Sequence, residues 1–371
     1  MAKLNFKVYC PGDSAIFKVN STIVYGEKEA WLVDAQFQKS RAQALADEIK
    51  ALGRKLTLVF VSYNDPDYYF GLDTIKANFP EAKIVSTAQT AWLIRATKDE
   101  KLGVWKEKLG DDAPSEIVIP EAVKELPLLE GEKVEIRQRD DDPAHSFLWI
   151  PSEKTILGGV YLTENRHPWL ADTHSVAAID AWIKGLEDET ALNPQRVIAG
   201  HFAKNIDCDK VLTNALAYMK AYRKAVSESS DAAGVVAKVK AQFPDYEDEG
   251  NLEFGAKVIK DEAQWTTRNL YPGIGRHVIA DFSPTVVFDL NFHDDKIMTF
   301  IGTDGVWKGY QDTVGFTATE VADNVFMVYW QEANGMAVVH VQNWNTKEVW
   351  TNIYAPGEKH ESYHMKGTLS L

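Results

Sequence analysis

Acidic and phenolic side chains are concentrated in the segment VSYNDPDYYFG, which spans residues 61–71. Its carboxylates, Asp65 and Asp67, are groups that general acid–base catalysis uses. Its phenols, Tyr63 and Tyr68, could donate hydrogen bonds to a developing oxyanion. The segment follows the apolar run KLTLVFVS, which predicts a strand covered on both faces, and precedes a helical pattern. Because α/β proteins place their sites where such strands end, this corner is the first candidate site.

Two histidines lie in later strand-like segments. His145 belongs to DPAHSFLWIPSEKTILGG, and His201 ends RVIAGH. Either imidazole beside Asp65 or Asp67 would make an acid–base pair. The same four side chains could instead hold one Zn²⁺, Fe²⁺ or Mn²⁺ ion. A third alternative is a packed relic in which Asp67 bonds backbone amides of its own turn.

These segments occur in an order that resembles the metallo-β-lactamase superfamily over about residues 5–260. VDAQF resembles its early strand that ends in Asp, the corner resembles its metal loop, and VIAGH resembles its last ligand segment. The family loop usually reads Thr-His-x-His-x-Asp-His, with Gly two residues later. The resemblance implies a four-layer αββα sandwich, α/β in class, and a hydrolase-type reaction on a small organic substrate.

The departures from that family affect the expected metal. Tyr63, Asp65 and Tyr68 replace family histidines, and Gly159 replaces an Asp that bridges two metals. A tyrosine must lose a proton with a pKa near 10 to bind Zn²⁺. The pattern therefore argues against a dinuclear zinc centre, and the expected cofactor is none or a single divalent metal. The ligands of that single ion would be Asp65, Asp67, His145 and His201.

Another segment, NRHPWLADT, resembles an active-site loop of one hydrolase-like branch. It makes His167 and Trp169 candidate substrate-binding residues at the pocket rim, with a packed loop as the alternative. The acidic run Asp140–Asp142 is expected to form a solvated turn.

After about residue 265 the pattern changes to regularly spaced strands with turns such as TDG and EANG, which predicts a small antiparallel barrel or sandwich. Residues 270–371 resemble the lipocalin-like barrel of the molybdenum cofactor biosynthesis protein F family. Trp330 and His340, with two further tryptophans, Trp344 and Trp350, could line a ligand cavity. An aromatic core and a homodimer face are the alternatives. The expected domains are 1–262, metallo-β-lactamase-like, and 263–371, a lipocalin-like all-β barrel.

Composition limits the classes of molecule that the protein is expected to bind. The formal net charge is −14, and an acidic surface repels phosphate backbones and anionic lipid. A small-molecule substrate and a homo-oligomer fit this charge, whereas nucleic acid and membranes do not. The beginning lacks a signal-peptide pattern, no run of about 18 apolar residues occurs, and Cys10 and Cys208 lie far apart, so a reducing cytoplasm is expected.

Three functional hypotheses follow from these observations. The first is a hydrolase-type enzyme in a pocket that has lost most metal ligands. The second is a metal-free lyase, isomerase or cyclase that uses the Asp, His and Tyr groups for acid–base chemistry. The third is a non-catalytic, small-molecule-binding pseudoenzyme.

Overall fold

The structure is a computed structural model, and it describes residues 4–139, 142–202, 208–265, 271–293, 296–322, 324–357 and 361–371. The chain forms two compact units, Met1–Arg268 and Asn269–Leu371, and each is described by itself. Within the described residues, no helix combines the length and apolarity that a membrane crossing requires.

The first unit contains two sheets of four or more strands that face each other. The larger sheet runs β1-β2-β3-β4-β5-β6, with antiparallel pairing from β1 to β3 and parallel pairing from β3 to β6. The smaller sheet runs β11-β9-β8-β7, and β10 pairs with β12 beside it. The strand bounds are β1 Asn5–Tyr9, β2 Ser21–Tyr25, β3 Glu29–Val33, β4 Lys55–Val61, β5 Lys83–Ser86, β6 Glu121–Ala122, β7 Glu135–Arg139, β8 Asp142–Ile150, β9 Thr155–Leu157, β10 Thr163–Glu164, β11 Arg196–Ile198 and β12 His201–Phe202.

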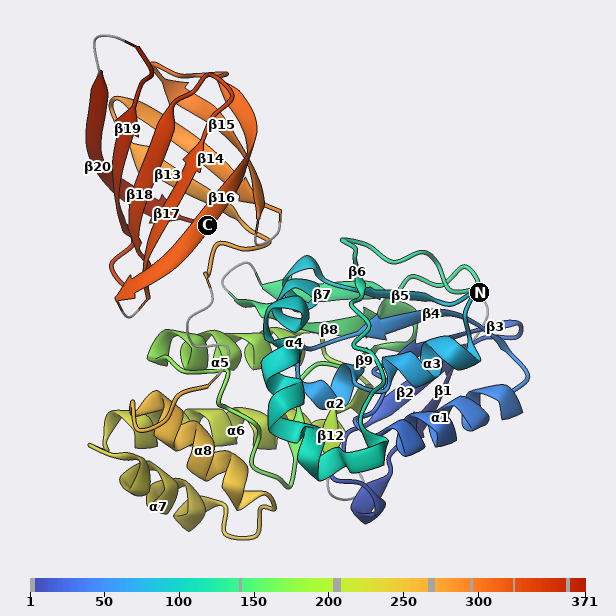
Figure 1. Cartoon of the computed structure of the whole chain (residues 1–371). Coiled ribbons are helices and arrows are strands. Elements are labelled where there is room, and N and C mark those ends of the chain that lie inside the picture. The colour runs from blue at the N-terminus through green and yellow to red at the C-terminus, as the bar shows by residue number, and fades with distance from the viewer. Residues whose placement is uncertain are drawn as a thin grey trace. The chain divides into compact units, whose positions relative to one another are not determined.

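Helices cover the outer faces of the sheets (Figure 1). α1 and α3 pack with the first sheet, and α5 and α6 with the second. The helix bounds are α1 Lys39–Ala51, α2 Pro66–Tyr69, α3 Leu72–Asn78, α4 Ala88–Leu109, α5 Val176–Ala191, α6 Cys208–Ser227, α7 Ala232–Gln242 and α8 Glu249–Ile259, with short 3₁₀ turns at Gly12–Ser14, Gly110–Asp112 and Pro151–Glu153.

Alternation along the central strands produces the layers. On β4, Leu58 and Phe60 belong to the core between the sheets, whereas Val59 and Val61 belong to the core beneath the helices. Strand β8 alternates in the same way. A strand with an apolar residue on each face is covered on both sides, as the run KLTLVFVS predicts. The expected αββα arrangement is therefore confirmed.

Helix α4 was not expected from the sequence. Its apolar residues follow no single face, because both the corner after β4 and the loops beyond it cover the helix. Thr87 caps its first turn by accepting a hydrogen bond from the backbone N–H of Thr90 at 3.2 Å. The helix buries the side chain of Lys101 completely, next to the corner.

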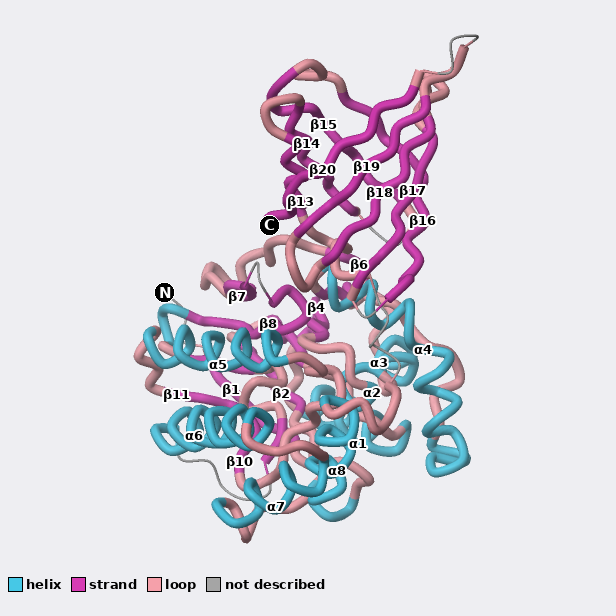
Figure 2. Tube along the Cα trace, turned by 90° about the vertical axis from the view of Figure 1, so that its left-hand side faces the viewer, coloured by secondary structure: helices cyan, strands magenta, loops and turns pink. Residues whose placement is uncertain are grey.

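The second unit is a closed antiparallel barrel, as expected. Its strands pair in sequence order, and β13 pairs with β20 to close it (Figure 2). The bounds are β13 His277–Phe282, β14 Val286–Phe292, β15 Ile297–Gly305, β16 Gln311–Ala322, β17 Val325–Gln331, β18 Ala337–Asn343, β19 Glu348–Tyr354 and β20 Ser362–Ser370.

The barrel interior is aromatic with a polar chain of hydrogen bonds. The Tyr271 hydroxyl donates to Gln342 Oε1 at 2.7 Å, which leaves the amide nitrogen to donate to His340 Nδ1 at 3.4 Å. Trp330 packs edge-on against the His340 ring, 4.8 Å between centroids. Trp350 does not join this interior, because its neighbours along β19 point inward and Trp350 lies under Lys366 on the outer face. Its expected place in a cavity lining is wrong.

Burial of His340 predicts an acid-sensitive barrel. Desolvation lowers the pKa of His340 from 6.5 to about 3. The folded state therefore resists protonation, so its stability is full above pH 6.5 and falls by about 1.4 kcal/mol per pH unit towards pH 3. Hydrogen exchange of barrel peptides in the full-length chain measures this loss. His340→Gln should flatten the acid slope, whereas His277→Gln, an exposed control, should leave it. An unchanged slope in His340→Gln would contradict the assignment.

Candidate functional site

A buried carboxyl group fixes the corner after β4. Asp34 follows β3 with a φ of 65°, and its two oxygens accept from the Ser62 N–H at 2.8 Å and the Ser62 hydroxyl at 2.7 Å. Desolvation raises the Asp34 pKa to about 8, against the lowering effect of both bonds. The Ser62 hydroxyl in turn accepts from the Gly159 N–H at 2.8 Å. These bonds tie the ends of three strands together below the polar side chains.

Asp67 and Tyr68 both bind His201. The Asp67 carboxylate lies 2.6 Å from His201 Nε2, and the Tyr68 hydroxyl lies 3.2 Å from His201 Nδ1. The same hydroxyl is also 3.2 Å from the carbonyl oxygen of Gly159. A Cβ on Gly200 would lie 2.5 Å from this hydroxyl, so a glycine is needed there for His201 to reach its partners.

Asp65 lies in a different environment although only one residue separates it from Asp67. Its side chain is buried, and Oδ1 is 3.6 Å from the Nζ atom of Lys101. Desolvation, followed by the negative charge of Asp172 and a hydrogen bond with it, raises the pKa of Asp65 well above its ordinary value, although the Lys101 charge opposes this. The surroundings of Asp65 therefore favour the neutral form of its carboxyl group.

His145 is held in an aromatic stack. Its ring lies between Tyr63 at 5.0 Å and Tyr161 at 4.9 Å, with interplanar angles of 12° and 21°. Asp142 binds His145 Nδ1 at 2.6 Å and accepts from the Tyr161 hydroxyl at 2.7 Å. The prediction of a solvated turn is wrong for Asp142, which is buried because it has these two partners; the rest of that run lies outside the described residues.

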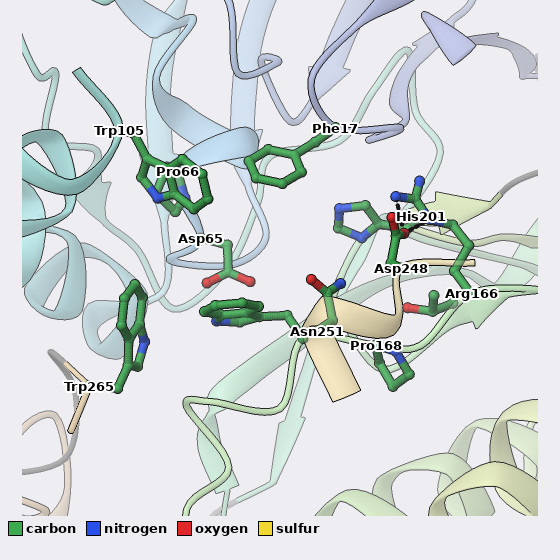
Figure 3. Close-up of a pocket in the computed structure, with 12 residues that line it drawn as sticks. Phe17, Asp65, Pro66, Trp105, Arg166, Pro168, His201, Asp248, Asn251 and Trp265 are labelled. Carbon is green, nitrogen blue, oxygen red and sulfur yellow. Dashed lines mark hydrogen bonds and ion pairs between the residues drawn. The ribbon is translucent and has the colours of Figure 1, made fainter. Parts of the chain in front are cut away.

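A pocket opens over Asp65 and His201 (Figure 3). The pocket encloses about 70 Å³, which is smaller than the roughly 300–1,000 Å³ typical of small-molecule sites. Phe17, Trp105, Trp169 and Trp265 supply its aromatic walls, and its polar lining residues are Asp65, Thr163, Arg166, His201, Asp248 and Asn251.

The sequence-predicted residues therefore lie in five different places. Asp65, His201 and Trp169 line the pocket, and Asp67 and Tyr68 stand behind His201. Tyr63 and His145 pack together deeper in the unit, away from the lining. His167 is buried with its Nδ1 2.8 Å from the Tyr218 hydroxyl, and desolvation lowers its pKa to about 4. Trp330 and His340 lie inside the barrel.

The candidate metal ligands have other partners. Asp67 and His201 bind each other, His145 binds Asp142, and Asp65 faces Lys101. Across the described ranges, no group of three or more His, Cys, Asp or Glu side chains is placed to hold a metal ion. Four-coordinate zinc needs at least three protein donors around one point. This arrangement does not fit the expected ion, and no catalytic step is assigned to one.

Several pocket residues were missed in the sequence. Lys101 reads as an ordinary surface lysine of a charged helix, and Asp172 ends the segment NRHPWLAD without a distinctive spacing. Trp265 donates from its indole nitrogen to Asp172 Oδ1 at 2.8 Å. The segment NRHPWLADT contains both Arg166 and Asp172. The charge of Arg166 beside His167 is the feature of the sequence that indicates a polar pocket residue there.

Comparison with known proteins finds similarities in both parts of the chain. Residues 274–370 match the family model described as MoaF-like. The chain is also similar to solved metallo-β-lactamases. The enzyme from Pontibacter korlensis is 14% identical, with 59% of this chain and 99% of that chain covered and a TM-score of 0.42. For the DIM-1 metallo-β-lactamase the values are 16%, 59%, 95% and 0.40. The sheets described above, rather than these matches, establish the fold of the first unit.

The Asp34 carboxyl group predicts a loss of stability as the pH rises from the acidic range towards about 8. Its pKa is raised by folding, so its contribution is full below pH 4 and is lost as pH rises to about 8. The expected slope is about 1.4 kcal/mol per pH unit. Asn at this position can accept from the Ser62 N–H and donate to the hydroxyl. Urea unfolding of Asp34→Asn should therefore lack the slope, while Asp47→Asn on the exposed face of α1 should retain it. Equal slopes in both variants would count against a buried, protonated Asp34.

Proposed function

We propose that the first unit is a metal-independent enzyme of the isomerase or lyase type, which moves a proton within a small organic carbonyl compound. Asp65 is the general acid, and the Asp67–His201 pair is the general base. The observation that carries this proposal is that a buried carboxyl group with a raised pKa and a carboxylate-bound imidazole line one aromatic pocket. An acid and a base in different surroundings are the arrangement that acid–base catalysis uses.

Asp65 is suited to donate because ionisation is costly at its position. Burial and Asp172 favour the neutral form, and Lys101 provides a cation 3.6 Å away for the carboxylate that forms after donation. A neutral carboxyl group in an apolar pocket can bond a carbonyl oxygen and stabilise the negative charge that develops there.

His201 is suited to accept because its surroundings accommodate both protonation states. While the ring is neutral, the Tyr68 hydroxyl can donate to Nδ1. After protonation, the hydroxyl can turn its hydrogen to the Gly159 carbonyl and accept from Nδ1 instead, since both distances are 3.2 Å. Asp67 at Nε2 stabilises the imidazolium in either step.

The proposed reaction balances without a co-reactant. As the Tyr68 hydroxyl turns its hydrogen from His201 Nδ1 to the Gly159 carbonyl, Nδ1 takes a proton from the carbon beside the substrate carbonyl. The C–H electron pair forms a C=C bond, and Asp65 gives its proton to the carbonyl oxygen. The reverse transfer at another carbon, or loss of a leaving group from it, completes an isomerisation or an elimination.

Exchange of substrate hydrogen for solvent deuterium tests the chemistry directly. Uncharged aryl ketones incubated with the protein in D₂O should lose the NMR signal of the hydrogen beside the carbonyl. Asp65→Asn and His201→Gln should each slow this exchange by about 10²–10⁴-fold, the usual range for one acid or base. Asp73→Asn is the carboxylate control on α3. Turnover of aryl esters without exchange would favour a hydrolase, and binding without either reaction would favour a pseudoenzyme.

Metal dependence provides a separate prediction. Protein purified without chelator should contain far less than one equivalent of zinc, iron or manganese by mass spectrometry, because its candidate ligands have other partners. Chelator should leave the exchange rate unchanged. A stoichiometric metal whose removal abolishes exchange would overturn the metal-independent assignment while leaving the pocket in place.

A further inference from the structure

The tryptophan walls of the pocket are held in position before any ligand binds. Trp265 is fixed by its bond to Asp172, and Trp169 packs edge-on against it at 5.2 Å while stacking on Phe254 at 5.5 Å. Trp105 meets Phe17 edge-on at 5.1 Å. Rigid aromatic surfaces of this kind favour a flat apolar ring, since little side-chain entropy is lost on binding.

Arg166 supplies a polar group that has no role in the proton transfer. Its side chain is buried, and its Nε and Nη2 atoms both bind the Asp248 carboxylate. Its Nη1 atom is buried without a hydrogen-bond partner in the part of the chain that the structure describes. Figure 3 shows the guanidinium beside Asp248, on the same side of the pocket as the His201 ring. A buried donor left without an acceptor is costly, so such a donor calls for a ligand oxygen or water.

The charges around the pocket decide what kind of oxygen suits Arg166. Asp248 already neutralises the guanidinium and would repel a carboxylate placed next to it. A cationic ligand is disfavoured as well, because Lys101 already places a cation 6.0 Å from the Trp265 ring centre. The combination favours an uncharged acceptor.

We infer that Arg166 is a specificity-determining residue that donates from Nη1 to a neutral oxygen of an aromatic substrate held between the tryptophans. The substrate class is an uncharged aromatic compound with an amide, ester or ketone oxygen. This inference rests on the proposed function for the identity of the pocket as the reaction site. The binding that it describes requires no turnover, so it can fail or succeed independently of the acid–base chemistry.

Binding of four matched probes tests this inference through quenching of tryptophan fluorescence and calorimetry. The probes are 2-naphthamide, 2-naphthoate, naphthalene and 2-naphthylmethylammonium. The full-length protein should bind the amide about tenfold to a hundredfold more tightly than naphthalene, the range for a hydrogen bond to a charged donor. The two ionic probes should bind more weakly than the amide.

Two variants separate the Arg166 bond from general damage to the pocket. Arg166→Gln should remove the preference for the amide and leave naphthalene binding unchanged, whereas Arg223→Gln on α6 should change neither. Asp248→Asn keeps the guanidinium and removes its counter-charge, so naphthoate should gain at least tenfold relative to the amide. Near-ultraviolet circular dichroism checks that each variant is folded.

Other outcomes would overturn the inference. In the first, the unmodified protein binds the ammonium or the carboxylate probe most tightly. In the second, Arg166→Gln lowers the affinity for all probes equally. In the third, Asp248→Asn does not raise the affinity for naphthoate. If the deuterium exchange fails but the amide preference depends on Arg166, the pocket is a binding site and the proposed catalysis is wrong. If exchange occurs and the preference does not depend on Arg166, only the assignment of Arg166 is wrong.

Discussion

The bond between Asp67 and His201 is the contact on which the pocket depends. It joins segments 134 residues apart, so that the corner after β4 and the start of β12 share one surface. A buried carboxylate needs a partner to offset its desolvation, and a buried imidazole needs a defined tautomer. The imidazole of His201 is the partner of the Asp67 carboxylate, and the carboxylate defines the tautomer of the imidazole. This mutual dependence also explains why the two side chains are poor candidates for binding an ion between them.

The sequence predicted the architecture because periodicity records which faces are buried. The continuous apolar run before Tyr63 predicted a strand between two layers, and the alternation from Phe326 to Trp330 predicted one buried face of a barrel strand. Both patterns are local, so they can be recognised without knowing which segments pack against the strand. The position of the corner was also predictable, because a polar cluster directly after such a strand lies at the carboxyl edge of the sheet.

The protonation states and partners could not be predicted in the same way. Asp142 reads as part of an acidic run, yet it lies between His145 and Tyr161, which are set by the β7–β8 register and by a later loop. Lys101 reads as a surface charge until the packing of α4 buries it. Such contacts depend on segments that approach only in the folded chain, so residue type and spacing carry no record of them.

Desolvation gives three neighbouring carboxyl groups three different uses. Asp34 is buried with two donors from Ser62 and ties the strands together; Asp65 is buried near Asp172, and its pKa is raised; Asp67 is buried against the His201 imidazole. The chemical group is the same in each case, and what differs is the charge or donor that burial places beside it. Carboxyl groups of one corner can therefore take different roles, because the distinction lies in their surroundings.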